Sequence, residues 1–94
     1  MRVSWLRTAL RNLEAEASFI AKDDAAAARL VVQRVLAAVA MLATQPALGR
    51  PGRVPNTREL VVLKTRYIVP YRMRGETIEI LRVFHTSRRL PQEW

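Results

Sequence analysis

The chain has 94 residues, no cysteine and one histidine, and its net charge at pH 7 is +8. The length suits a single domain over residues 1–94, and the lack of cysteine excludes disulfides, a thiolate nucleophile and a cysteine-ligated zinc site. With one histidine we expect no metal site, and nothing in the sequence calls for a cofactor. The excess of basic residues predicts an acidic partner, either nucleic acid, an acidic protein or both.

Targeting and membrane signals are not apparent in the sequence. The N-terminal segment has no apolar stretch of the kind that a secretory signal needs. The longest apolar-rich run, 30–43, is interrupted by Gln33 and Arg34, so it is not typical of a membrane span. We therefore expect a cytoplasmic protein that does not enter a membrane.

The first half of the chain predicts a strand followed by two helices. Residues 2–6 alternate in polarity and indicate a strand. Thr8 is an acceptable N-cap for a first helix, whose apolar residues recur at helical spacing: Ala9, Leu10, Leu13, Ala17 and Ile20. Asp23 or Asp24 is expected to cap a second helix that runs through Thr44. The short link between the helices predicts an antiparallel helical hairpin.

The second helix carries a wide apolar arc. Its inner stripe is expected to comprise Val31, Val35, Ala38 and Leu42. Four more residues widen the arc beyond what one contact surface requires: Leu30, Val32, Leu36 and Val39. The arc is consistent with a protein-docking surface, and equally with a helix that is fully packed in the core.

Residues 45–56, QPALGRPGRVPN, are rich in glycine and proline and predict a loop. The sequence GRPG within it lacks the lysine and the following helix of a phosphate-binding loop. We therefore interpret the segment as a connector between the helical hairpin and a sheet.

The last third of the chain predicts three strands. Residues 58–64 contain the apolar run LVVL, which is typical of a short strand buried on both faces. Residues 67–74 and 77–86 alternate in polarity, and Gly75 permits a tight reversal between them. The register of this hairpin then pairs Met73 with Ile78, Tyr71 with Ile80 and Arg72 with Glu79. Pro70 cannot donate a ladder hydrogen bond, so it requires a bulge or a locally unpaired position.

Arginines gather on this hairpin and at its exit: Arg72, Arg74, Arg82, Arg88 and Arg89. Only Glu76 and Glu79 oppose them in this stretch, which favours a binding patch over a solvated charged face. His85 is a candidate general acid or base because its unperturbed pKa lies near neutrality. The sequence places no carboxylate near it, which favours a strand-end histidine satisfied by one hydrogen bond. Trp94 is expected to be exposed unless the tail folds back.

Together these elements predict an α+β fold with the order β-α-α-β-β-β. The antiparallel helical hairpin is expected to pack on one face of a small twisted, mainly antiparallel sheet. The sequence pattern leaves open which strand neighbours the first one.

This order and three motifs resemble the ParE/RelE superfamily of bacterial type II toxins. The motifs are GRPGRVPNTRELVV, YIVPYRM and IEILRVFHTSRRLP, which cover residues 49–62, 67–73 and 78–91. The resemblance implies a small toxin neutralised by a cognate acidic antitoxin, ParD-like or RelB-like, which alone connects the pair to operator DNA. The antitoxin would contact the apolar helical surface, for which we select Leu13, Ile20, Val32, Leu36 and Val39.

Two target classes divide the superfamily. RelE-like members cleave mRNA on the ribosome with basic catalytic residues, and this chain has Glu59, Val61 and Ile68 at the corresponding positions. It also has Pro91 or Gln92 where many members have a tyrosine. The departure favours the ParE-like branch, whose members inhibit DNA gyrase and have no such catalytic set.

The ParE-like interpretation assigns no catalytic residue. Its target-contacting residues are Arg72, Arg74, Arg82, His85, Arg88, Arg89 and Trp94. The alternative is a RelE-like ribosome-dependent mRNA endonuclease with His85 as acid or base and Arg82 or Arg88 at the phosphate. A basic nucleic-acid-binding module would explain the charge but neither the apolar arc nor the motifs.

Overall fold

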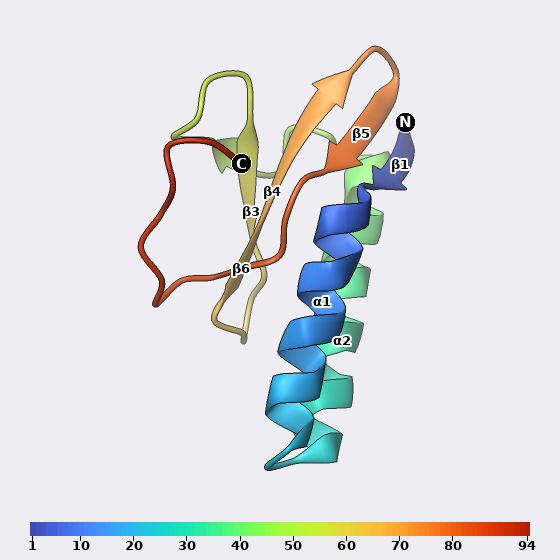
Figure 1. Ribbon diagram of the computed structural model, residues 1–94. Helices are drawn as coiled ribbons and strands as arrows, with labels where there is room; N and C mark the ends of the chain where they lie inside the picture. The colour runs from blue at the N-terminus through green and yellow to red at the C-terminus, as the bar shows by residue number, and fades with distance from the viewer.

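The computed structural model describes residues 1–94 and places two helices on one face of a mixed sheet (Figure 1). In chain order the elements are β1 Arg2–Trp5, α1 Arg7–Ala21, α2 Ala25–Ala40, the 3-10 turn η1 Met41–Ala43, β2 Arg50–Pro51, β3 Arg58–Val61, β4 Tyr67–Arg74, β5 Thr77–Ile80 and β6 Phe84–His85. The strand order is β1-β5-β4-β3-β2, and β6 pairs with β4. The predicted α+β class is confirmed, and β5 is the neighbour of β1, in parallel orientation.

The two helix starts differ in how well the sequence predicted them. Asp24 caps α2 as expected, because its side chain accepts the Ala27 amide at 3.0 Å. The prediction of Thr8 as the cap of α1 is wrong, since Leu6 is the N-cap residue and makes no side-chain cap bond. The Leu6 amide bonds the Ile80 carbonyl at 3.0 Å, so the sheet ladder holds the residue from which the helix starts.

The apolar arc of α2 lies partly in the core and partly at the surface. Val35, Val39 and Leu42 are buried in the cluster that joins the helices to the sheet. The segment Ala25–Ala43 is long and apolar enough, by length and composition alone, to cross a membrane. In this fold its inner stripe packs against β4 and β5, which supply Tyr71 and Ile80 to the same cluster.

The predicted register of the last hairpin is confirmed. Tyr71 pairs with Ile80, Arg72 with Glu79 and Met73 with Ile78. Tyr71 and Ile80 are completely buried, whereas Met73 is 46% exposed because the end of the hairpin projects beyond the helices. The buried part of the hairpin therefore ends near Ile78.

The predicted strand 77–86 is interrupted, and Pro70 explains where. Between the β4–β5 and β4–β6 pairings the register shifts by one residue, so the connecting segment 81–83 contains a bulge. The Pro70 carbonyl accepts a hydrogen bond from the Leu81 amide at 2.9 Å. In an antiparallel sheet, the carbonyl and the nitrogen of one residue point to the same neighbouring strand. The Pro70 nitrogen, which has no hydrogen to donate, therefore points toward the bulge, where the ladder does not need a donor. The Val83 amide instead donates to Asn12 Oδ1 at 3.2 Å.

Two further expectations are corrected around β3. The predicted loop 45–56 contains the short strand β2, which pairs with Arg58 and Glu59. The run LVVL is buried on one face only: Leu60 and Val62 lie in the core, while Val61 is 46% and Leu63 78% exposed. The side chains of this strand therefore alternate between the core and the solvent, and the strand is not buried on both faces.

The C-terminal tail folds back over the face of the sheet opposite the helices (Figure 1). Phe84, which pairs with Ile68, stacks edge-on against Trp94 with ring centroids 5.3 Å apart. Arg53 donates to the Pro91 carbonyl, and Arg82 Nε donates to the Trp94 carbonyl at 2.8 Å. Trp94 is consequently only partly exposed, with a buried indole N–H that has no hydrogen-bond partner.

Candidate functional site

All of the predicted target-contacting residues except Arg89 border three neighbouring hollows. Arg72, Arg74 and Trp94 border the first, and Arg82, Arg88 and Trp94 border the second. His85 and Arg88 border the third. Because adjacent hollows share Trp94 or Arg88, the structure brings these residues into one continuous line from the hairpin to the far end of β4. We call this line the basic face.

Arg72 and Arg74 share one carboxylate on the hairpin. Arg72 Nε donates to Glu79 Oε1 at 2.7 Å, and Arg74 Nε lies 3.7 Å from the same oxygen. The hydrogen bond from Arg72, aided by the charge of Arg74, holds the pKa of Glu79 below its ordinary value. Two guanidinium groups against one carboxylate leave this end of the basic face with positive charge.

The other end of the basic face is fixed by a buried carboxylate that the sequence analysis missed. Glu16 on α1 accepts the Tyr67 hydroxyl at 2.9 Å and Arg88 Nη2 at 2.8 Å. Burial, then the hydrogen bond to Glu16 and its charge, raises the pKa of Tyr67 to about 12, while Arg88 opposes the shift. Glu16 follows Leu13 by three residues on the inner face of α1, and this spacing was the available signal.

His85 is held by its own turn. Its Nδ1 accepts the Ser87 amide at 3.1 Å and lies 2.7 Å from the Ser87 hydroxyl. An acceptor Nδ1 leaves the proton of the neutral ring on Nε2. The ring meets Tyr67 edge-on with centroids 5.1 Å apart. The hydrogen-bond partners of this histidine are therefore the amide and the hydroxyl of Ser87, and not a carboxylate.

Arg89 differs from the other basic residues of the tail. It is exposed and takes part in none of the ion pairs, whereas Arg88 is tied to Glu16. Of the two adjacent arginines, Arg89 is therefore the one whose charge is fully available to a partner.

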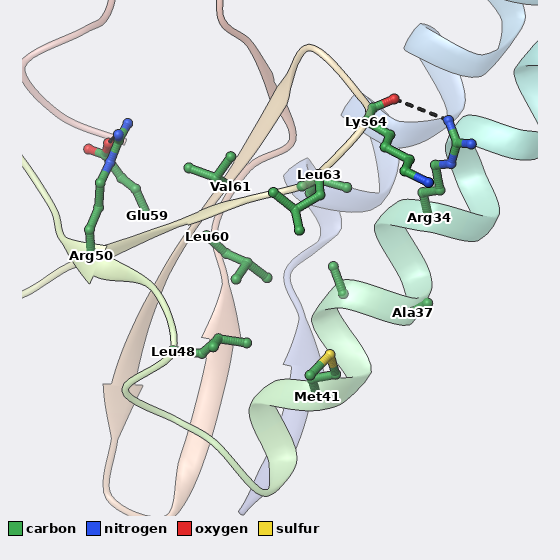
Figure 2. Close-up of a pocket in the computed structure, with 12 residues that line it drawn as sticks. Arg34, Ala37, Met41, Leu48, Arg50, Glu59, Leu60, Val61, Leu63 and Lys64 are labelled. Carbon is green, nitrogen blue, oxygen red and sulfur yellow. Dashed lines mark hydrogen bonds and ion pairs between the residues drawn. The ribbon is translucent and has the colours of Figure 1, made fainter.

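A second feature is an apolar groove between α2 and the edge of the sheet (Figure 2). Its volume is about 550 Å³, and its apolar lining includes Ala37, Met41, Leu48, Leu60, Val61 and Leu63. Arg50 lies at one end of the groove in Figure 2, and Arg34 and Lys64 lie at the other. We call it the edge groove. The sequence signal for it was the LVVL run, whose outward residues we had expected to be buried.

The residues selected for antitoxin contact fall into two groups. Leu13 and Val39 belong to the buried core, so this part of the selection is corrected: neither has surface to offer in the folded chain. Ile20 and Val32 are partly buried against that core, and Leu36 is exposed. The wide arc of α2 had combined inner and outer residues in one set.

The comparisons agree with this architecture. The family model for the ParE toxin of the type II toxin-antitoxin system parDE matches residues 3–90. A curated relative, "Putative toxin Y4kP" from Sinorhizobium fredii (strain NBRC 101917 / NGR234), is 47% identical over 91 residues, which is 97% of this chain and 94% of the relative. A solved structure titled "Chromosomal ParDE TA system from P. aeruginosa" superposes with a TM-score of 0.81 at 28% identity. The match covers 90% of this chain and 95% of that chain.

A small helical hairpin on a mixed sheet, with a basic face and an apolar edge, defines a toxin-like fold of the ParE/RelE type. The chain belongs to the ParE toxin family of type II toxin-antitoxin systems. Membership implies an antitoxin partner.

Proposed function

We propose that this toxin inhibits DNA gyrase in the cytoplasm through its basic face, and that an acidic antitoxin encoded beside it neutralises it. The observation that carries the proposal is the basic face itself, a line of arginines whose side chains are held by ion pairs and hydrogen bonds, with the exposed Arg89 next to Arg88 in the chain. Positive charge in a fixed arrangement favours an acidic target and increases the rate of encounter with it.

The positions that carry catalytic basic residues in RelE-like enzymes support the same proposal. Glu59 is buried and accepts from Arg50 Nη2 at 3.2 Å and from the Arg53 amide at 3.1 Å. Ile68 is buried on β4, opposite Val61 of β3. Glu59 therefore ties the loop before β3 to the sheet, and Ile68 packs inside the protein. Neither side chain offers a basic group to activate a 2′-hydroxyl or to stabilise a phosphorane.

The proposal is tested in cells by inducing the chain alone and with the neighbouring acidic gene. Gyrase inhibition predicts a DNA-damage response while protein synthesis continues, and co-expression of the neighbour should restore growth. An abrupt stop in translation without DNA damage would contradict gyrase as the target and favour mRNA cleavage. Harmless, high-yield expression of the chain as a monomer would contradict toxicity itself.

A further inference from the structure

The third hollow of the basic face lies between the end of α1 and the turn that joins β3 to β4. Figure 1 shows this turn and the loop between the helices at the same end of the molecule. The volume of the hollow is about 630 Å³, which is in the range of small-ligand sites. The positions that are catalytic in RelE-like enzymes, Glu59, Val61 and Ile68, are not among its lining residues. We call it the turn hollow, and it is bordered by Phe19, Lys64, Arg66, His85 and Arg88.

Three cationic side chains line the turn hollow against a single carboxylate. Lys64 and Arg66 are exposed and take part in none of the ion pairs. Arg88 donates to Glu16 through Nη2 at 2.8 Å and its side chain is 58% exposed, so its other N–H groups can reach a ligand. Three cations and one carboxylate leave the hollow with a charge of +2. This charge matches that of a phosphate monoester, about −2 near neutral pH.

Hydrogen bonds hold the backbone of the turn that carries two of these cations. Arg34 Nη1 donates to the Lys64 carbonyl at 3.1 Å (Figure 2). The Thr86 amide donates to the Arg66 carbonyl at 2.8 Å, which places Arg66 beside the His85 turn. Lys64 has φ +63°, a conformation that is uncommon for a residue with a Cβ atom. Because the backbone is already fixed, less freedom is lost when the two side chains bind an anion.

His85 and Phe19 add a neutral donor and an aromatic surface to the cations. The His85 ring contacts Ser87 through Nδ1, so the proton on Nε2 is available to a ligand. Phe19 follows Glu16 by three residues, which places both on the same face of α1, and Phe19 is 67% exposed. Lys22 Nζ lies 6.0 Å from the centroid of the Phe19 ring. An exposed aromatic ring beside clustered cations suits a nucleotide, whose base stacks on the ring and whose phosphate meets the cations.

We propose that the turn hollow is a nucleotide site, in which the phosphate lies among Lys64, Arg66 and Arg88 and the base stacks on Phe19. The ligand is a mononucleotide or the 5′-phosphorylated end of a strand, since both present a base beside a phosphate monoester. An acidic peptide would meet the cations but would leave the aromatic ring unused. This site goes beyond gyrase inhibition. Because His85 and Arg88 also belong to the basic face, a bound nucleotide would occupy one end of that face.

Calorimetric titration of the purified toxin tests this inference with four probes: AMP, inorganic phosphate, and a short deoxyadenosine strand with and without a 5′-phosphate. AMP should bind more tightly than phosphate, because only AMP can use the Phe19 ring. The strand should bind more weakly once its 5′-phosphate is removed. Bound AMP should shift the amide resonances of Arg66 and Ser87, which places it in the turn hollow. Whichever of AMP and the phosphorylated strand binds more tightly identifies the source of the nucleotide.

Variants separate the contact with the base from the contact with the phosphate. Phe19→Ala should weaken AMP binding about fivefold or more and leave phosphate binding within about twofold, because it removes only the stacking surface. Phe19→Tyr keeps the ring and should bind AMP within about twofold of the parent. Arg66→Gln should weaken AMP and phosphate alike, about tenfold, because both lose a charged hydrogen-bond donor. Arg11→Gln, at an exposed arginine of α1 outside the turn hollow, is the matched control and should stay within about twofold.

Each variant is first shown to melt normally. Equal losses in Arg66→Gln and Arg11→Gln would show that the overall charge of +8 attracts AMP without a specific site, and would overturn the inference. Unchanged AMP binding by Phe19→Ala, or no binding of either AMP or the phosphorylated strand, would also overturn it. A blocked tetraglutamate peptide that binds as tightly as AMP would show that an acidic segment is the occupant, again against the inference. These titrations contain neither gyrase nor antitoxin, so their result does not depend on the proposed target.

Discussion

Gly49 lies directly against Tyr71, and their contact ties the long connecting loop to the centre of the sheet. The Tyr71 hydroxyl accepts the Gly49 amide at 2.9 Å and donates to the Pro46 carbonyl at 2.7 Å. A Cβ atom on Gly49 would lie 2.6 Å from Cε1 of Tyr71 and 3.0 Å from the Glu59 carbonyl. The glycine of the GRPG stretch is therefore explained by close packing, and no bound phosphate is needed to account for it.

Gly49→Ala should lower the free energy of unfolding by about 1–3 kcal/mol, because a side chain forced into a packed site displaces its neighbours. Gly75→Asn is the matched control, since Gly75 has φ +62° in open space and asparagine tolerates that conformation. Chemical denaturation should place the control within about 1 kcal/mol of the parent. Equal losses in both variants would contradict the packing account.

Ile80→Ala should cost about 2–5 kcal/mol, because Ile80 is fully buried opposite Tyr71. Met73→Ala on the neighbouring strand removes a side chain that is 46% exposed and should cost much less, about 1 kcal/mol or below. Thermal melts compare the two variants. A melt of Ile80→Ala that matches the parent would show that the assigned core face of the hairpin is incorrect.

The Tyr67 hydroxyl should make stability depend on pH in the alkaline range. Its pKa is about 12 in the fold against 10.0 ordinarily, so the neutral hydroxyl is favoured by folding. The resulting stability, about 2–3 kcal/mol, is fully present below pH 10 and is lost as the pH rises from 10 to 12. Denaturation curves between pH 9 and about 11.5 should show this loss in the parent and a smaller one in Tyr67→Phe. The same slope in both proteins would contradict the assignment.

Glu16 should hold the C-terminal tail in place through Arg88. Glu16→Ala leaves the Tyr67 hydroxyl without its acceptor and Arg88 without its ion pair. We expect faster tryptic cleavage after Arg88 and Arg89, because the tail then opens more often. Glu14→Ala, at an exposed carboxylate on the same helix, is the control and should cleave at the parent rate. Unchanged cleavage in Glu16→Ala would show that other contacts hold the tail.

The sequence predicted best where two periodic patterns had to agree. In the last hairpin, Met73, Tyr71 and Arg72 found chemically matched partners across Gly75, so a single register satisfied the pattern. The cap at Asp24 was similarly local, since one carboxylate and one amide decide it. Features of this kind depend on residues that are close in the chain, so they can be predicted from the sequence alone.

Predictions failed where distant segments decide the outcome. Thr8 looked like a cap, but the ladder bond of Leu6 to Ile80 starts the helix earlier. We predicted that Leu13 and Val39 contact a partner, but in the folded chain both are buried in the core between the helices and the sheet. The ion pair between Glu16 and Arg88 joins residues 72 positions apart, so the spacing of neighbouring residues does not predict it.

The most direct test of the proposed target measures DNA supercoiling by purified gyrase and mRNA cleavage on translating ribosomes with one preparation of toxin. The account predicts inhibited supercoiling and intact mRNA. Inhibition should be lost when Arg88 and Arg89 are both replaced by alanine, and largely kept in His85→Ala, because binding requires no proton transfer. Each variant must first bind antitoxin and melt normally. Unaffected gyrase, together with codon-phased mRNA cuts that vanish in His85→Ala, would contradict it.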